Sequence, residues 1–275
     1  MKLFSALGLL VWLAIPSHSY ADELITTPLL DASEIINKNI SARGGLEAWQ
    51  KIQTMVWIGH IESAHAPIAK MPFVLEMKRP NKTRFEIKAQ NQKSVRIFDG
   101  NQGWKMRPTS SGKPDLQQYT NEELRFARDE PSIGGLLMGL QSNAADVTLD
   151  GVEDVAGQQA YRLSIKLPSG VTHHVWVDTH SFLDIKYDRE FINKLGQSVM
   201  VPVFNRNYQS MGGLQVPLLI ETGEGATEPP DKLLIEKVLL NPPLEENIFA
   251  KPSVPQRRNA VTVNAVAEER PEDVR

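Results

Sequence analysis

The chain has 275 residues, a formal net charge of −3 and no cysteine. The absence of thiols excludes disulfides, cysteine nucleophiles and cysteine-ligated zinc. The near-neutral charge gives no electrostatic footprint for nucleic acid or for an anionic bilayer surface. A chain of this length can bury enough apolar surface to fold without cross-links.

The first residues indicate export. Lys2 is followed by an apolar run from Leu3 to Ile15 and by small residues that end at Ala21. The run is shorter than the roughly 20 apolar residues that a membrane-spanning helix needs. The pattern therefore predicts a cleavable signal peptide over residues 1–21 and a soluble exported protein.

A helix is predicted soon after this leader. Asp31 and Glu34 have the spacing of a capping box, and Ile36 and Ile40 recur at helical spacing. The glycines at 44–45 end the helix. One amphipathic helix before a β-rich region is predicted to pack on one face of a sheet.

From about residue 54 to residue 240 the dominant pattern has a period of two. Phe73, Leu75 and Met77 alternate with more polar neighbours, which is typical of a half-buried strand. Short turns between such runs favour antiparallel hairpins. The run 55–61 is apolar on both sides, which suits a sheet curled around an interior and covered on its other face. The fold class is therefore predicted to be mainly β (α+β), with a curved antiparallel sheet.

The strand pattern is interrupted between residues 121 and 142. A charged, helix-favouring stretch is broken by Pro131, and the apolar, glycine-containing run Ile133–Leu140 follows. Residues 253–275 lose periodicity and are predicted to be a disordered tail. We therefore expect one domain over residues 22–252.

The sequence contains no motif of a known catalytic site. Nucleophile-elbow, zinc-protease, Walker and dinucleotide-binding motifs are all absent. His173 and His174 are adjacent on a strand and point to opposite faces, while Asp178 and His180 lie at a strand end where solvated polar residues are usual. We therefore expect no metal, no cofactor and no enzymatic activity.

Arg79 is the most informative charged residue. Counted by twos, it lies on the same face as Phe73 and Met77, the face assigned to the interior. It either points inward or lies beyond the strand end and reaches solvent. An inward guanidinium needs carbonyl or carboxylate partners, because an unpaired buried charge is too costly.

Several features occur in a particular order along the chain. They are the signal peptide, the early helix, Lys78-Arg79-Pro80, Ile97-Phe98-Asp99-Gly100-x-x-x-Trp104, the apolar insert Ile133–Leu140 and Phe249-x-Lys251-Pro252. From about Asp31 to Pro252 the chain resembles the LolA-like family of periplasmic outer-membrane lipoprotein-sorting proteins. The chain differs from the short carriers of that family by a larger second half and an added tail.

The resemblance implies an incomplete β-barrel with an N-terminal helix and an apolar cavity closed by short lid helices. It implies a periplasmic monomer that binds acyl chains of a lipoprotein or lipid and passes the cargo toward the outer membrane. An inner-membrane donor protein and an outer-membrane acceptor protein would be its partners. Arg79 would contact the lid when the cavity is empty, and the lid would include Ile133, Leu136, Leu137 and Leu140.

Candidates for cargo binding come from strand faces and from the insert. They are Trp57, Met77, Val95, Ile97, Met138 and Tyr161. Ordinary core packing is the competing interpretation for each, since strand faces alone do not locate a cavity. An envelope sensor or regulatory binding module of the same fold is the alternative function. A hydrolase is a third class, for which the sequence shows no catalytic constellation.

Overall fold

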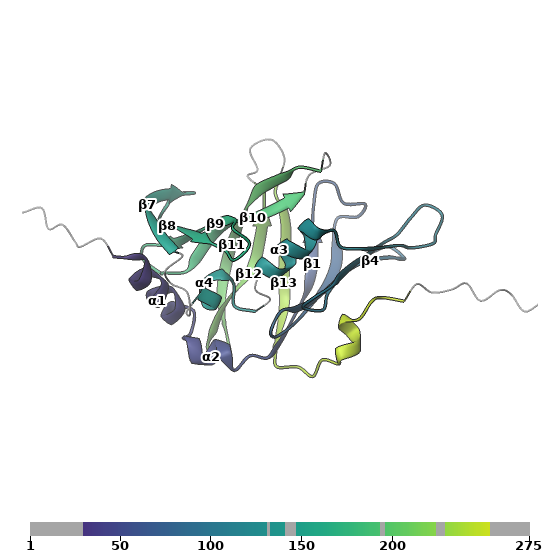
Figure 1. Ribbon diagram of the computed structural model, residues 1–275, viewed down its shortest axis with the longest axis horizontal. Coiled ribbons are helices and arrows are strands. Elements are labelled where there is room, and N and C mark those ends of the chain that lie inside the picture. Colours follow the sequence, from purple (N-terminus) through teal and green to yellow (C-terminus); the bar gives the residue numbers. More distant parts are fainter. Residues whose placement is uncertain (1–29, 131–132, 141–146, 193–195, 224–228, 254–275) are drawn as a thin grey trace, which may run out of the picture. The chain divides into compact units, whose positions relative to one another are not determined.

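The sheet consists of two meanders that meet at the first and last strands of the chain. The computed structural model describes residues 30–130, 133–140, 147–192, 196–223 and 229–253 (Figure 1). From Asp31 on, they belong to one compact unit. The predicted signal peptide at 1–21 and the tail after Ser253 lie outside the described residues.

The first meander runs from β1 to β6 and the second from β7 to β13. The first consists of β1 (Thr54–Glu62), β2 (Met71–Lys78), β3 (Lys82–Ala89), β4 (Gln92–Phe98), β5 (Gly103–Arg107) and β6 (Asp115–Gln118). The second consists of β7 (Val147–Val155), β8 (Gln158–Lys166), β9 (Thr172–Asp178), β10 (Asp184–Ile192), β11 (Ser198–Met211), β12 (Leu214–Thr222) and β13 (Asp231–Leu240).

Antiparallel pairing of β1 with β13 joins the meanders into one sheet. Within the described residues this sheet has 13 strands, and β6 and β7 are its two edges. Every neighbouring pair is antiparallel. Because the edges do not pair with each other, the sheet is not closed into a barrel. The predicted fold class, an open antiparallel sheet with few helices, is confirmed.

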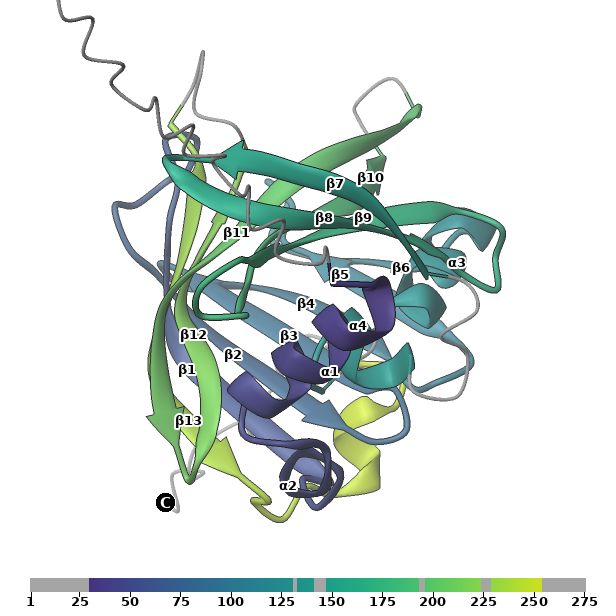
Figure 2. The same ribbon diagram turned by 90° about the vertical axis from the view of Figure 1, so that its left-hand side faces the viewer.

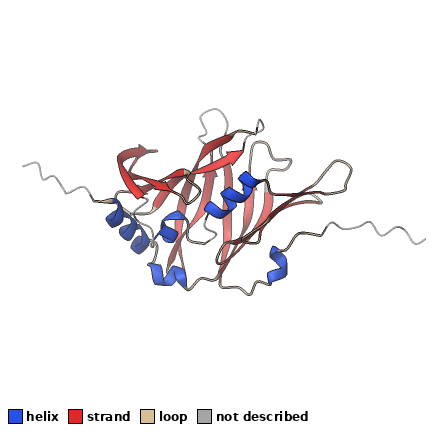
Figure 3. Ribbon diagram, viewed as in Figure 1, coloured by secondary structure: helices blue, strands red, loops and turns tan. Residues whose placement is uncertain are grey.

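Short helices accompany the sheet (Figure 3). The α-helices are α1 (Ala32–Ala42), α2 (Leu46–Gln50), α3 (Asn121–Asp129) and α4 (Leu136–Gly139), and η3 (Glu246–Phe249) is a 3-10 helix. The predicted capping box opens α1, where the Asp31 carboxylate accepts from the Glu34 amide at 2.7 Å and the Glu34 carboxylate accepts from the Asp31 amide at 3.0 Å. None of the helices in the described ranges is long and apolar enough to cross a membrane.

Strand register separates the residues of the sheet into two faces. Directly opposed residues of an antiparallel pair point to the same side, so Met55 shares a face with its partner Met77. Helices α1, α2 and α4 lie against this face, which we call the inner face (Figure 2). The opposite, outer face is covered in the first meander by η3, whose Phe249 packs with Val95 and Ile97. On its outer side the first meander is therefore covered over β4 and β5, whereas Ile58 of β1 borders an open pocket.

Candidate functional site

The segment 133–140, which we call the lid segment, packs against the helices on the inner face. Ile133, Leu137 and Met138 are buried, whereas Leu136 and Leu140 are partly exposed. Gly134 has φ +97°, and a Cβ there would lie 3.0 Å from the Cβ of Met138. Only glycine fits this turn without strain, so the entry into α4 depends on it.

Arg43 ties the lid segment to the first two helices. Its Nη1 donates to the Gly134 carbonyl oxygen at 2.7 Å, and its guanidinium lies 4.8 Å from the centroid of the Trp49 ring. The indole Nε1 of Trp49 donates in turn to the Arg43 carbonyl oxygen at 2.9 Å. With only 6% of its side chain exposed, Arg43 is a buried cation at the contact between α1, α2 and the lid segment.

Arg79 points inward, toward α2. Its Nε donates to the Ile52 carbonyl oxygen at 2.9 Å and its Nη2 to the Trp49 carbonyl oxygen at 3.2 Å. Burial lowers the pKa of Arg79. The direct contact with the lid segment is made by Arg43 instead, and Arg79 connects β2 to α2. That Arg79 acts on the lid segment stays a prediction. Any such effect would be indirect and transmitted through Trp49.

A buried polar cluster adjoins Arg43 at the start of β10. The Asp184 carboxylate lies 3.3 Å from Arg43 Nη1 and accepts from the Asn39 side-chain amide at 3.3 Å. The side-chain amide of Asn205 donates to the Asp184 backbone at 3.0 Å, and the Tyr208 hydroxyl donates to the same carbonyl oxygen at 2.9 Å. Burial, reinforced by the Asp184 charge, raises the pKa of Tyr208 well above its ordinary value. Tyr208 is therefore a neutral donor at physiological pH.

The predicted cargo-binding residues divide between the two faces. Trp57 and Met77 lie on the inner faces of β1 and β2, and Met138 lies in the lid segment. Tyr161 lies on the inner face of β8 and stacks on Phe182 with ring centroids 6.2 Å apart. Their role in cargo binding stays a prediction.

Val95 and Ile97 do not share the inner face with Met77. On β4 the inner position belongs to Arg96, which is directly opposite Phe85 of β3. Val95 and Ile97 point outward and pack with Met106 in the core cluster beneath η3. They therefore lie on the other side of the sheet from Met77, where η3 covers them, and their predicted role in cargo binding stays a prediction.

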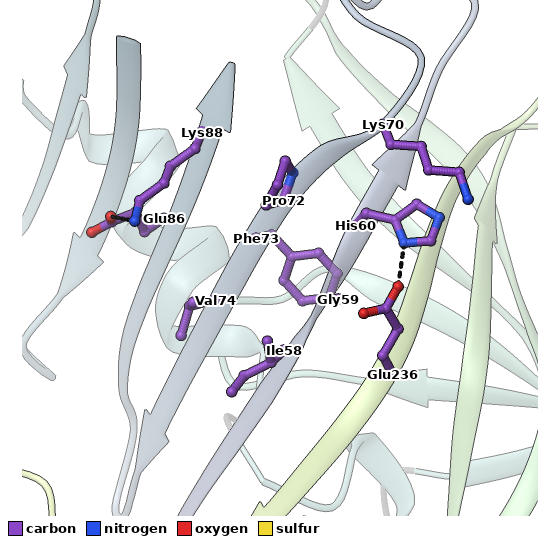
Figure 4. Close-up of a pocket in the computed structure, with 10 residues that line it drawn as sticks. All are labelled: Ile58, Gly59, His60, Lys70, Pro72, Phe73, Val74, Glu86, Lys88 and Glu236. Atoms are coloured by element: carbon purple, nitrogen blue, oxygen red, sulfur yellow. Dashed lines mark hydrogen bonds and ion pairs between the residues drawn. The ribbon is translucent and has the colours of Figure 1, made fainter. Parts of the chain in front are cut away.

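Two pockets open on the outer face. One, of about 380 Å³, has Ile58 and Val74 on its floor and lies beside a β-bulge, where Glu236 is an extra residue in β13 (Figure 4). Glu236 bonds His60 Nδ1 at 2.7 Å. The other pocket, of about 520 Å³, lies between η3 and β4. On the inner face the lid segment packs with its side chains Ile133, Leu137 and Met138 buried.

The predicted Asp178-x-His180 pair forms a turn. The Asp178 carboxylate accepts from the amides of His180 at 3.1 Å and Ser181 at 2.6 Å. Burial acts to raise the pKa of Asp178, but the hydrogen bonds from Ser181 and His180 outweigh it and lower the pKa. In the described residues no group of three or more His, Cys, Asp or Glu side chains is placed to hold a metal ion.

Neither Arg43 nor Asp184 is among the site residues predicted from the sequence. A signal for Arg43 is present, because it follows Ile36 by seven residues and Ile40 by three and so continues the apolar stripe of α1. Asp184 carries no local signal, since its partners come from α1 and β11, far away in sequence.

No protein-family profile matches the sequence, and no curated protein is similar to it at a significant level. The structure is similar to a LolA superfamily protein from Nitrosomonas europaea, with 16% identity, a TM-score of 0.49 and coverage of 81% of this chain and 99% of that one. A DUF1329 family protein from Desulfovibrio piger shows 12% identity and a TM-score of 0.49, over 79% of this chain and 96% of that one. A domain assigned to an outer membrane lipoprotein-sorting protein from Vibrio parahaemolyticus shows 12% identity and a TM-score of 0.48, over 79% and 95% of the two chains.

One open antiparallel sheet carries an N-terminal helix and short helices on its inner face, as the resemblance implies.

Proposed function

We propose that this protein is a periplasmic carrier that binds acyl chains of a lipoprotein or lipid on its inner face. The observation that carries the proposal is the lid segment, which covers that face with buried Ile133, Leu137 and Met138. Its hydrogen bond to Arg43 uses a backbone carbonyl oxygen, an acceptor that another molecule can replace. An apolar cargo can displace an apolar cover of this kind from its binding site.

The magnitudes favour exchange between lid and cargo. Burial of the lid's three large side chains contributes roughly 1.5–3 kcal/mol each, or about 5–9 kcal/mol together, as an upper estimate. An acyl chain of about 15 methylenes gains about 12 kcal/mol on full burial. The cargo therefore outcompetes the lid while it is bound, and closure of the lid offsets part of the cost of release.

Transport toward the outer membrane requires a donor at the inner membrane and an acceptor at the outer membrane. The predicted export signal supports this role. In the carrier cycle, loading opens the lid segment and release to the acceptor closes it.

The lid can be opened by a single methyl group. Gly134→Ala places a Cβ against Met138 at a backbone angle that disfavours alanine, whereas Gly139→Ala meets no atom within 4 Å and is the matched control. We expect Gly134→Ala to bind a fluorescent fatty-acyl probe about tenfold more tightly than wild type, because its lid no longer competes. Gly139→Ala should bind like wild type.

Native mass spectrometry of the periplasmically expressed protein provides the direct test. Acylated species should co-purify with wild type and leave on addition of acceptor vesicles. A protein without acylated species, and with no probe binding even in Gly134→Ala, would contradict the carrier function. Recovery of a membrane-anchored regulator in place of acylated cargo would identify the alternative, an envelope sensor.

A further inference from the structure

The region beneath the lid segment is not purely apolar. It contains the buried polar cluster, which joins α1 to β10 and β11 and consists of Asn39, Arg43, Asp184, Asn205 and Tyr208. A site that receives only hydrocarbon has no use for such groups, because buried charges and amides cost free energy unless they are fully bonded.

Two atoms of the polar cluster are not fully bonded. Arg43 Nε and Asn39 Oδ1 are buried and have no hydrogen-bond partner among the described residues. Arg43 is 5% exposed and Asn39 is fully buried, and Arg43, the C-cap residue of α1, follows Asn39 of that helix by four residues. A buried donor without an acceptor calls for an explanation in a folded protein, and a ligand with an acceptor group supplies one for Arg43 Nε.

The lid segment already shows which group fits. The Gly134 carbonyl oxygen receives the 2.7 Å hydrogen bond from Arg43 Nη1. When the lid leaves, Arg43 loses this acceptor but keeps Asp184 at 3.3 Å. A carbonyl oxygen at the head of an acyl chain would restore the lost bond.

The charge of the polar cluster distinguishes neutral from anionic head groups. The Arg43 cation and the Asp184 anion compensate each other, and Asn39, Asn205 and the neutral Tyr208 add no charge. An additional buried carboxylate or phosphate would therefore lack a counter-charge, which carries a large desolvation penalty. A neutral ester or amide carbonyl carries no such penalty.

We propose that the polar cluster binds the ester or amide carbonyl of an acylated cargo and excludes free fatty acids. This inference rests on the carrier function proposed above and specifies its cargo. Arg43 donates to the cargo carbonyl in the position that Gly134 occupies in the closed protein. Asp184 maintains the neutrality of the site.

Methyl palmitate and palmitate test this proposal, because they share one chain and differ in head-group charge. In displacement of a fluorescent acyl probe, wild type should prefer methyl palmitate by about tenfold. Asp184→Asn leaves the Arg43 charge uncompensated, so its preference should reverse toward palmitate. Glu236→Gln makes the same charge change in the outer-face pocket and should keep the wild-type preference.

Arg43→Lys is a second test of the proposal if Asp184→Asn folds poorly. It keeps the charge but loses Nε and the planar fork, so chain binding should persist while the preference for the ester falls. Equal affinity of wild type for methyl palmitate and palmitate, or no reversal in a folded Asp184→Asn variant, would overturn the proposal. Failure to bind either compound would instead overturn the carrier function itself.

Discussion

Each face of the sheet carries a cover over part of its area, and the two covers are held in different ways. On the outer face, η3 inserts Phe249 into a core cluster with Val95 and Met106, and Glu246 pairs with Lys78 and Lys82 at 2.6 Å each. On the inner face, the lid segment is held by its apolar side chains and by a backbone carbonyl bonded to a buried arginine.

The difference shows which cover can be exchanged. Phe249 is built into a continuous core, so removing η3 would expose the outer apolar residues of β4 and β5 with nothing to replace it. The lid contributes an apolar surface and one acceptor oxygen, both of which an acylated molecule also possesses. We therefore interpret η3 as structural and the lid segment as functional.

The largest expected effect is a difference in the free energy of unfolding between variants of η3 and variants of the lid segment. Phe249→Ala should lower the free energy of unfolding by about 3–5 kcal/mol, because Phe249 is 1% exposed and leaves a cavity. Leu137→Ala, at a side chain 2% exposed, should cost only about 2 kcal/mol, since the loss cannot exceed the free energy of lid closure. Urea unfolding measures both, and equal losses would show that the lid is as much a part of the core as η3.

An intermediate effect is expected at Arg79. Arg79→Leu leaves the carbonyl oxygens of Trp49 and Ile52 without their charged donor and should cost about 1.5–3 kcal/mol. Trp49 packs against Arg43 and Gly134, so we expect cargo binding to persist while lid closure, and with it release to acceptor vesicles, becomes slower. Arg79→Lys is the control that keeps the charge, and transfer by Arg79→Leu at the wild-type rate would exclude any role in closure.

The smallest effect concerns the surface ion pairs of η3. Hydrogen bonds from Lys78 and Lys82 lower the pKa of Glu246 from its ordinary value to about 2. A carboxylate whose pKa is lower in the folded than in the unfolded state stabilises the fold at pH values above its unfolded-state pKa. This stabilisation is lost as the pH falls toward 2. Glu246→Gln should thus lower the Tm slightly at pH 7, and less in high salt, because exposed pairs are screened. The difference in Tm between variant and wild type should vanish near pH 2, and a constant difference would exclude the ion pairs as its cause.

Much of the architecture could be predicted from local patterns. The capping box at Asp31, the alternation of Phe73 and Met77 and the turn residues between strands each have a mechanism that acts over a few residues. Which face of the sheet each side chain of β4 occupies could not be predicted, because Val95 and Ile97 on one side and Phe98 on the other are all apolar. The choice of face was settled by η3, which lies more than a hundred residues further along the chain.

The candidate site was predictable only in part. The lid segment was recognisable by its apolar, glycine-containing sequence, and strand parity left the inward direction of Arg79 as one of two alternatives. The contact of Arg43 with Gly134 depends on how α1 meets α4, which is a property of tertiary packing. A polar residue that continues the apolar stripe of a helix is the sequence signal to weigh more heavily.

The seam between β1 and β13 has a consequence for how the chain acquires its structure. Each meander can form from neighbouring hairpins, whereas the seam brings Met55 against Leu240. Loop-closure entropy grows slowly with length, so the long separation adds little to the thermodynamic cost, but non-local strand pairing slows folding. The two meanders should therefore gain protection from hydrogen exchange early and the seam last. Only after that step do β6 and β7 become the two free edges of a single sheet.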